Sequence, residues 1–412
     1  MSSTTHADKC PIGHTGSDRK TERAGERYQP AIEEVDGTWH LRSQHLVRQA
    51  LREFGDESVQ EGFSAQLIRA NTSGMRTPVL YMDGEPHRQV RAKIARYFAP
   101  VTVGRRYRDL MEARADELVA QARQRREFEL DQISLRMAVH VAAQVIGLTN
   151  SDMERMTRRL ESFFEFPSVT PGAKAESRLA KLRVKLRSAR SSLPLLFFHL
   201  HDVKPAIKER RTRPQEDVIS HLIEEGYKDG EILAECLTYG AAGMVTTREF
   251  IVVAAWRLLE RPELLNRYLA AEETERHKIL HEILRVEPVV GHIYRTAVDP
   301  ITLTEGEQSW TIPAGALIDM YVRAANADAE AVGEHPHAIC PDRARARGVR
   351  PEVMSFGDGS HRCPGSHIAI QETDILLTRL LKLPLTVVRT PSMSWVDVVA
   401  GYELRGMTLR IG

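Results

Sequence analysis

The sequence predicts one large, mainly helical domain with a small β-portion segregated from the helices. Apolar residues recur at helical spacing almost without interruption from about residue 85 to residue 244. A long helix then extends from Asp229, which suits the N-cap position, to about Glu260. Strand-like alternation dominates only after Val298. Because helices and strands occupy separate parts of the chain, we expect them to form separate layers of one domain.

The elements that flank the helical region are shorter. The first 30 residues are polar, and we expect a flexible tail at 1–30 followed by one domain at 31–412. Residues 38–43 alternate like a short strand, and the residues after them return to helical spacing. Proline-containing stretches at 167–174 and 211–217 break the helical pattern, and the end of the chain alternates as strands do.

The composition excludes several classes of protein. Lys plus Arg number 57 and Asp plus Glu number 56, whereas a dedicated nucleic-acid binder has a strong basic excess. No apolar signal core begins the chain, and no run approaches the ~18 apolar residues of a membrane helix. The four cysteines are widely scattered, as in a reduced cytosolic protein and unlike a disulfide framework. We therefore expect a soluble cytoplasmic protein.

One cysteine, Cys363, lies in a loop with the sequence SFGDGSHRCPGSHIA. A cysteine acts as a ligand or nucleophile only as the thiolate, so its surroundings must favour the charged form. Pro364 suits the first turn of a helix, and the periodicity that follows places Cys363 at or just before a helix N-terminus. Gly357 and Gly359 allow backbone conformations closed to other residues, so the loop can lie flat against a large planar group, with Phe356 shielding one side.

Three other interpretations of this loop remain open from the residues alone. His361, Cys363 and His367 would make a zinc site, although no second cysteine or histidine pair has matching spacing. Cys363 would be a nucleophile if a histidine elsewhere in the chain served as its base. It would be a buried structural cysteine if it follows the usual behaviour of free cysteines.

The loop resembles the haem-ligating signature of the cytochrome P-450 family, Phe-x-x-Gly-x-x-x-Cys-x-Gly. The four fixed positions are filled here by Phe356, Gly359, Cys363 and Gly365. The resemblance implies that Cys363 is the axial ligand of the iron of haem b (iron protoporphyrin IX). It also implies that Phe356, Gly357 and Gly365 lie against this cofactor. The resemblance extends from about residue 34 to the C-terminus and is to soluble bacterial-type members.

A Glu-x-x-Arg motif, Glu282 and Arg285, lies upstream of the cysteine. The spacing of i and i+3 puts both side chains on one helix face, and a solvated surface pair is the simplest explanation. The pair stands at about the family's usual distance from Cys363. The resemblance implies that it binds the proline- and arginine-rich segment before the loop, here called the meander, and supports the loop under the haem.

Four residues match the family's partners of the haem propionates. His87 and Arg91 share a helix face at i and i+4, Arg295 lies in an Arg-x-Ala strand, and His361 lies in the cysteine loop. Taken singly, each is more simply an ordinary surface cation. The resemblance implies that together they give charge-assisted hydrogen bonds to the two carboxylates.

The long central helix carries Gly240 and Gly243, each about 1 kcal/mol less favourable than alanine in a helix interior. Helix packing explains such glycines, and so does close approach to a haem with room for a bound diatomic molecule and a local bulge. The family pattern Ala/Gly-Gly-x-Asp/Glu-Thr is matched here by AGMVT, ending at Thr246. Gly243 and Thr246 are retained, whereas Val245 stands where the family has an acid.

The valine at position 245 leaves the route of proton delivery open. Cleavage of an O–O bond needs two protons, and the Val245 side chain cannot supply or relay them. Water, the substrate or another side chain replaces the acid, or the enzyme runs a specialised oxidation that a substrate group assists. Alternatively, the protein uses peroxide or has a role without oxygen transfer. We favour the first two explanations together, with Thr246 in the relay.

The resemblance places a substrate pocket over the haem between the central helix, the loop before His87 and the helical hairpin around residues 162–174. The strand after Arg285 and the terminal hairpin close it. Its expected lining is apolar and aromatic, which suits a hydrophobic small molecule, although plain core packing gives the same spacing. The expected lining residues are Phe163, Phe164, Phe166, Ala241, Met244, Val245, Val289, Val290, Ile293 and Val398. His292 is either a polar anchor for the substrate or a buried histidine with protein partners.

The resemblance implies a haem-thiolate monooxygenase that oxidises a secondary-metabolite or lipid-like substrate. A peroxide-driven enzyme, an oxidative coupling or dehydrogenation enzyme, and a non-catalytic haem sensor are the alternatives. The chain carries no flavin or nicotinamide domain, so electrons would come from a ferredoxin or flavodoxin with its reductase. The expected docking surface is the arginine cluster before the cysteine loop. It comprises Arg343, Arg345, Arg347 and Arg350.

Overall fold

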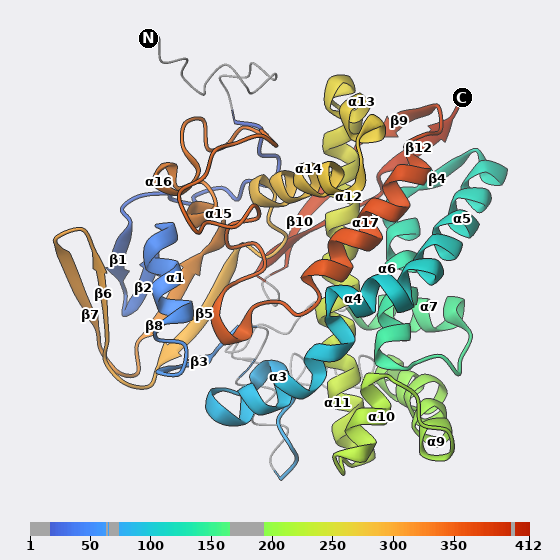
Figure 1. Cartoon of the computed structure of the whole chain (residues 1–412), viewed down its shortest axis with the longest axis horizontal. Helices are drawn as coiled ribbons and strands as arrows, with labels where there is room; N and C mark the ends of the chain where they lie inside the picture. Colours follow the sequence, from blue (N-terminus) through green and yellow to red (C-terminus); the bar gives the residue numbers. More distant parts are fainter. Residues whose placement is uncertain (1–16, 63–64, 66–73, 165–192, 397–399) are drawn as a thin grey trace, which may run out of the picture.

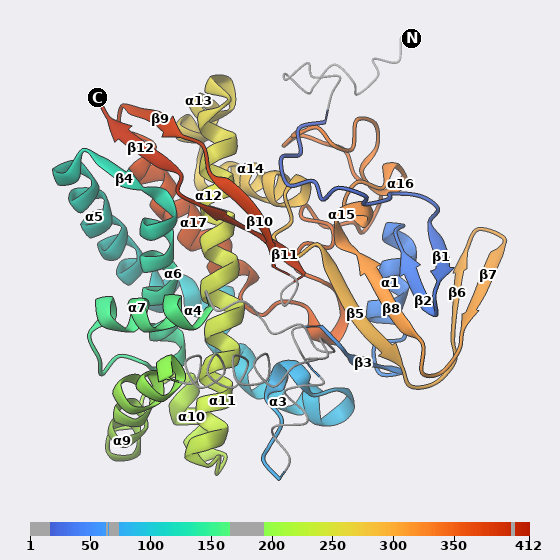
Figure 2. The ribbon, with the colours of Figure 1, turned by 180° about the vertical axis from the view of Figure 1, so that it is seen from behind.

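The structure is a computed structural model that describes residues 17–62, 65, 74–164, 193–396 and 400–412. Most helices lie on one side of the molecule and most strands on the other, with the long central helix along their border (Figure 1). The opposite view shows the same division (Figure 2). The predicted fold class, mainly helical with a segregated β-portion, is confirmed.

Most of the described helical elements precede residue 287, and most of the described strands follow it. The helical elements are α1 (Gln44–Arg52), η2 (Val79–Tyr81), α3 (Gly84–Phe98), α4 (Pro100–Thr102), η3 (Val103–Tyr107), α5 (Arg108–Arg125), α6 (Leu130–Ile146), α7 (Met153–Phe164), η4 (His199–Val203), α9 (Lys204–Thr212), α10 (Val218–Glu224), α11 (Asp229–Gly240), η5 (Ala241–Val245), α12 (Thr246–Leu259), α13 (Pro262–Ala270), α14 (Glu273–Val286), α15 (Val322–Ala325), α16 (Ala329–Val332), η6 (Gly359–His361) and α17 (Ser366–Leu380). The strands are β1 (Ile32–Val35), β2 (Thr38–Leu41), β3 (Ser58–Gln60), β4 (Glu127–Glu129), β5 (His292–Ala297), β6 (Ile301–Glu305), β7 (Gln308–Ile312), β8 (Leu317–Tyr321), β9 (Leu385–Arg389), β10 (Ser392–Val396), β11 (Gly401–Arg405) and β12 (Thr408–Ile411).

The central helix is continuous over α11, η5 and α12. It ends at Leu259 with Glu260 as its cap, as predicted. Its start differs by one residue, because Lys228 is the N-cap and Asp229 is the first helical residue. The Glu231 carboxylate accepts the Lys228 N–H at 2.8 Å, which satisfies a donor that the helix leaves without a partner. Asp229 and Glu231 both lie in the first turn, where the helix dipole favours negative charge.

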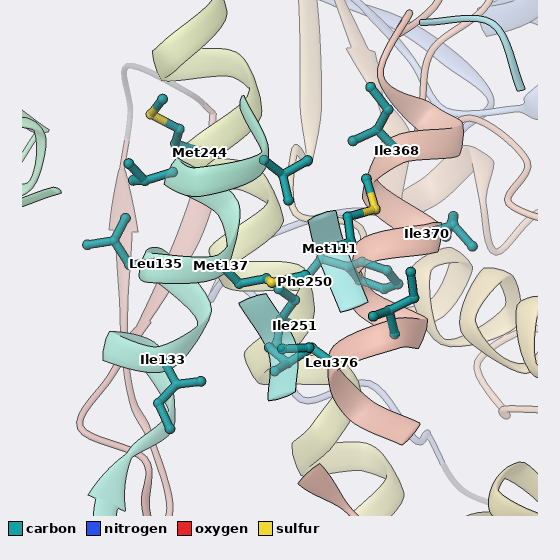
Figure 3. Packing of buried hydrophobic residues seen from close by; sticks show 14 of the residues in the cluster. Met111, Ile133, Leu135, Met137, Met244, Phe250, Ile251, Ile368, Ile370 and Leu376 are labelled. Carbon is teal, nitrogen blue, oxygen red and sulfur yellow. The ribbon is translucent and has the colours of Figure 1, made fainter. Parts of the chain in front are cut away.

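The main hydrophobic core lies where α12 packs against α6 and α17 and where α5 packs against the same two helices. Figure 3 shows side chains from these helices meeting, among them Met111, Met137, Ile251 and Leu376. All four are buried, with exposures of 0%. Burial of one such side chain contributes roughly 1.5–3 kcal/mol, so this core fixes the central helix against the helix that follows the cysteine loop.

The main sheet has five strands in the order β1-β2-β8-β5-β3. Only the β2–β8 pair is parallel among the pairs of this sheet in the described chain. The buried Leu46 and Val47 of α1 join a second core with Ile318 and Met320 of β8. The predicted strand at 38–43 is β2, and strand structure begins somewhat before Val298, at β5. This layer brings α1, β3 and β5 next to the cysteine loop.

Residues 17–30 do not form the expected flexible tail. Asp18, Arg19 and Thr21 are buried, with exposures of 8%, 6% and 0%. Their polar groups find partners on distant segments, as when the Arg19 Nε donates to the Val286 carbonyl at 2.6 Å. The polarity of this segment therefore serves specific hydrogen bonds. Residues 1–16 lie outside the described part of the chain.

The two predicted breaks in the helical pattern have different outcomes. Residues 211–217 separate α9 from α10, where Asp217 caps α10 through the Ser220 N–H at 2.8 Å. Residues 167–174 lie outside the described part. Among the helices that the structure describes, none is both long enough and apolar enough to span a membrane.

Candidate functional site

The cysteine loop is a tight turn between the meander and α17. The Cys363 N–H donates to the Phe356 carbonyl at 2.9 Å, which closes the loop on itself. Helix α17 begins at Ser366 with Gly365 as its N-cap, so Cys363 precedes the helix as predicted. Pro364 lies in the turn before the first helical residue, where we had expected it inside the first turn.

Two glycines shape the loop. Gly357 and Gly359 both have φ of +66°, a conformation that side chains with a Cβ rarely adopt. A Cβ on Gly359 would lie 2.0 Å from the Leu51 carbonyl oxygen of α1, so no other residue fits there. A Cβ on Gly357 would meet the Ile293 side chain at 3.8 Å. The loop is thus pressed between α1 and the strand β5.

The Glu-x-x-Arg pair is buried and does not form a solvated surface pair. The side chains of Glu282 and Arg285 are 1% and 0% exposed, and the two join at 2.7 Å. Arg285 also donates to the carbonyl oxygens of Asn326, Pro336 and Ala338 at 2.6–2.9 Å. The pair therefore binds the meander to α14.

Asn326 connects this pair to the loop. Its Nδ2 donates to the Arg285 carbonyl at 3.0 Å and to Ser355 Oγ at 2.8 Å, and its Oδ1 accepts the Met354 N–H at 2.8 Å. The backbone before Phe356 is thereby anchored to α14. The sequence motif did not identify Asn326 as part of this support.

The arginine cluster before the loop is not the surface patch that we expected. Arg343 is buried, at 5% side-chain exposure, and its Nε lies 3.1 Å from Glu282 Oε1. Its Nη atoms donate to four meander carbonyls. Arg343 is therefore part of the meander's internal structure, because it satisfies carbonyls that lack strand or helix partners. Arg350 is paired with Asp358 at 3.0 Å, Arg345 is half-buried, and Arg347 is exposed.

The expected propionate partners come from three elements, α3, β5 and η6, and two of them contact a carboxylate, Asp83, that sequence reasoning missed. Asp83 Oδ1 lies 2.7 Å from Arg295 Nη2 and 3.2 Å from His361 Nε2. Burial alone would raise the pKa of Asp83, but the hydrogen bond with His361 and the charge of Arg295 outweigh it and lower that pKa. An acid just before the helix of His87 and Arg91 was the signal in the sequence.

The histidines of this cluster stack on each other. The rings of His87 and His361 lie 3.8 Å apart between centroids and within 7° of parallel. Burial lowers the pKa of His87 to about 3 and also lowers the pKa of His361, so both rings are neutral at pH 7. Within the described chain, His87 Nδ1 is buried without a hydrogen-bond partner.

The two arginines of the cluster differ in the protein groups to which they donate hydrogen bonds. Arg295 donates to Ser58, Gly55 and Asp83, which joins β5 to β3 and to the start of α3. Arg91 Nη2 donates to the Arg362 carbonyl at 2.5 Å, next to the cysteine. Arg91 is therefore the arginine of this cluster that binds the backbone directly before Cys363.

The central helix changes its winding at the expected glycines. Residues Ala241–Val245 form a π-helical turn, η5, in which each hydrogen bond closes a wider ring, and such turns are common at functional sites. Ala242 is exposed there, and Gly243, Val245 and Thr246 are only partly buried, although α12 directly after them is largely buried. The Thr246 hydroxyl donates to the Ala242 carbonyl at 2.6 Å. This face of the helix therefore borders open space.

A buried acid contacts the same helix one residue after Thr246. Glu372 of α17 is 3% exposed, and within the described chain its Oε2 has no hydrogen-bond partner. Burial raises the pKa of this carboxyl well above its usual value, against a hydrogen bond with Thr247, the neighbour of Thr246. Sequence reasoning missed Glu372, although its spacing from Ile368 and Ile375 places it on the buried face of α17.

The expected pocket residues are only partly brought together. Ala241, Val290 and Ile293 are partly exposed, as pocket walls require, whereas Val289 is 6% exposed. Met244 belongs to the main core at 0% exposure and does not line a pocket, because the π-helical turn directs it toward α6. Phe166 and Val398, and the side chains of Phe163 and Phe164, lie outside what the structure describes. His292 is a buried histidine with protein partners, Asp319 and Glu26.

Comparison with known proteins adds independent information. The sequence model described as "Cytochrome P450" matches residues 276–383. The chain is 26% identical over 366 residues to the erythromycin C-12 hydroxylase of Saccharopolyspora erythraea, which covers 86% of this chain and 83% of that relative. It is 28% identical over 310 residues to the cyclomarin C epoxidase CymV of Salinispora arenicola, with 72% and 70% of the two chains covered.

Similar folds occur among solved structures. Substrate-free CYP109E1 from Bacillus megaterium matches with a TM-score of 0.71 at 21% identity, covering 92% of this chain and 95% of that one. P450BioI in complex with an acylated acyl carrier protein matches with a TM-score of 0.71 at 21% identity, covering 91% and 92%. The zinc interpretation of the loop finds no support, because no group of three candidate side-chain ligands occurs among the described residues.

Gly359 offers a direct test of the loop geometry. Replacing Gly359 with Ala puts a Cβ 2.0 Å from the Leu51 carbonyl oxygen, and we expect the free energy of unfolding to fall by about 2–4 kcal/mol. Gly306→Ala is the matched control, because Gly306 has φ of +59° but nothing within 4 Å of an added Cβ. Its expected loss is about 1 kcal/mol. Urea unfolding measures both, and equal losses would show that contact with α1 does not constrain the loop.

Proposed function

The chain belongs to the cytochrome P450 family of monooxygenases, and from this premise we propose that it holds a haem b through Cys363 and oxidises a hydrophobic small molecule. The observation that carries the proposal is that Cys363 lies in a glycine-shaped loop closed by its own N–H, and that Arg91 of the expected propionate cluster binds the carbonyl directly before it. When bound, a thiolate-ligated haem supplies the oxidising chemistry that transfers an oxygen atom from O2 to the substrate.

The residues present fit such a cofactor. The Gly365 N–H donates to the Cys363 sulfur, and the charges of Arg91 and Arg362 favour its thiolate, although burial still raises the pKa of the thiol. On the polar edge, His87 Nδ1 and Arg362 Nε are buried donors without partners in the described chain. We propose that Arg91, His87, His361 and Arg295 hold the propionates. Asp83 contacts both His361 and Arg295 and would compete with the propionates for these two donors.

Cys363 provides the principal test. We expect the reduced purified protein to give the red-shifted carbon monoxide band of thiolate ligation and Cys363→Ser to lose it, because a serine oxygen is a far weaker ligand. Cys340→Ser is the control, since Cys340 is a buried cysteine that lies in the meander and not in the loop. Difference spectroscopy measures the band, and its persistence in Cys363→Ser would contradict the ligand assignment.

We propose that Thr246 and Glu372 replace the acid missing at Val245. The Thr246 hydroxyl donates to the Ala242 carbonyl, so its oxygen lone pairs remain able to accept a hydrogen bond from a neighbour on the exposed face. Burial raises the pKa of Glu372, which favours its protonated form, and a hydrogen bond joins it to Thr247. Ordered water or a substrate group would connect these groups, which lie on adjoining faces of the helix.

Thr246→Ala tests this relay. We expect the peroxide released per electron pair to rise several-fold and coupled product to fall, because protons arrive more slowly. Thr238→Ala is the matched control, since Thr238 Oγ1 also donates to the carbonyl four residues earlier in the same helix, at 2.9 Å. The assay uses a hydrophobic compound chosen by the spin-state shift it causes. Unchanged coupling and leakage in Thr246→Ala would contradict the relay.

We propose a secondary-metabolite or lipid-like substrate. The partly exposed residues of the helix face and of the segment before β5 are apolar, which favours hydrophobic ligands. Among the relatives, one is named for hydroxylation of erythromycin and one for epoxidation of cyclomarin C. A peroxide-driven, coupling or dehydrogenation reaction remains the second candidate because Val245 cannot relay protons. Catalysis with peroxide and without redox partners would favour it.

We propose that electrons come from a separate ferredoxin or flavodoxin that docks beside the cysteine loop. Of the arginines before the loop, Arg347 is exposed and Arg345 half-exposed, so these two remain as candidates once Arg343 is assigned to the meander. Cations at this place attract an acidic donor and raise its association rate.

Charge reversal tests the docking surface. Arg347→Glu should slow reduction by an acidic ferredoxin several-fold at low ionic strength and flatten the salt dependence, because steering is lost. Arg213→Glu is the control, since Arg213 is exposed at 80% but lies between α9 and α10. Stopped-flow reduction measures both variants. Equal rates for the two would place the docking surface elsewhere.

A further inference from the structure

Residues 17–28, here called the N-terminal strap, run along the segment that joins α14 to β5. That segment, residues 286–292, contains the partly exposed Val290, and the proposed function places the segment in the wall of the substrate pocket. The strap contacts both ends of the segment through buried polar groups. The sequence offers no helix or strand pattern for residues 17–28, and their role depends on these contacts.

The first anchor holds the start of the segment. The Glu287 carboxylate is 0% exposed and accepts hydrogen bonds from the Lys20 N–H at 2.7 Å, the Thr21 N–H at 3.1 Å and the Thr21 hydroxyl at 2.7 Å. Arg19 Nε donates to the Val286 carbonyl at 2.6 Å. Loss of any of these donors leaves a buried acceptor less satisfied, which is costly.

The second anchor holds the end of the segment. Glu26 Oε1 lies 3.2 Å from His292 Nε2, and the other ring nitrogen of His292 lies 2.9 Å from Asp319. Both Glu26 oxygens also accept from Arg323 Nε at 2.9 Å. These hydrogen bonds and charges outweigh burial and lower the pKa of Glu26 to about 2, so the carboxylate is ionised at pH 7.

Arg323 extends the second anchor to the C-terminal hairpin. Its guanidinium lies 4.8 Å from the centroid of the Trp395 ring of β10. A Cβ on Gly291 would lie 1.8 Å from Arg323 Nη1, so the guanidinium presses directly on the backbone of the pocket segment. The Gly291 N–H donates to the Ala400 carbonyl at 2.8 Å, next to β11. Glu26 thus holds in place the Arg323 guanidinium, which contacts both residues 286–292 and the hairpin of β10 and β11.

We infer that the N-terminal strap is a positioning element of the substrate pocket, in which Thr21 and Glu26 hold the two ends of residues 286–292 in place. Val290, between these ends, pairs with Gly401 of the hairpin, so its position follows from the two anchors and the hairpin together. The inference rests on the proposed function for the location of the pocket. The strap sets the width available to a bulky ligand without contacting that ligand.

The test compares two nitrogen ligands of ferric haem on the full-length holoprotein. Imidazole is small and needs little room, whereas 4-phenylimidazole also needs space beside the pocket wall. We expect Glu26→Ala to change the ratio of their dissociation constants about tenfold, because the wall loses one anchor. Glu22→Ala, in the exposed part of the strap, should change this ratio less than twofold. A general loss of stability would affect both ligands alike.

Hydrogen exchange gives a second measurement on the same variants. The Gly291 and Val322 amides should exchange about tenfold faster in Glu26→Ala, because Gly291 loses the guanidinium that holds it. If Glu26→Ala does not fold, Thr21→Val removes only the hydroxyl bond to Glu287 and replaces it in both measurements. An unchanged ratio and unchanged exchange, with the thiolate carbon monoxide band intact, would overturn the inference. Absence of that band from the wild type would instead overturn the proposed function.

Discussion

The buried pair of Glu282 and Arg285 is the interaction on which the site depends most. Arg285 is 0% exposed, and its guanidinium satisfies three carbonyls of the meander in addition to Glu282. Removal of one partner from such a pair leaves an uncompensated buried charge, which typically costs about 3–5 kcal/mol. Because Arg343 joins the same carboxylate, one acidic group organises a long segment without regular secondary structure. The cysteine loop follows directly from that segment and takes its position from it.

The loop is then held from two further directions. Close contact between Gly359 and the Leu51 carbonyl seats it on α1, and the Cys363 N–H bond to Phe356 closes it. On its polar edge, Asp83 draws together Arg295 and His361, two of the four cations or histidines expected around a haem. The π-helical turn η5 of the central helix presents partly exposed small residues and Thr246, and the proposed function assigns this turn to the substrate side.

Local signals in the sequence predicted more of the support than of the pocket. The loop, the Glu-x-x-Arg pair and the bulge near Gly243 each carry a short pattern with a direct physical cause, such as a required positive φ or a shared helix face. The errors concern residues whose environment is set by distant segments. Arg343 resembles a surface arginine in sequence and is buried, Met244 packs into the core, and residues 17–30 resemble a tail but form buried hydrogen bonds. Asp83 and Glu372 were missed for the same reason.

The sequence by itself determined the fold class, the long central helix, the cysteine loop and the valine that replaces an acid, because periodicity and turn chemistry act over a few residues. The tertiary structure alone decided which charges are buried and what they contact. Asp83 meets His361 across 278 positions of the chain, and Glu26 meets Arg323 across 297. No local pattern encodes such meetings, since they follow only when the helical and β-portions have packed against each other.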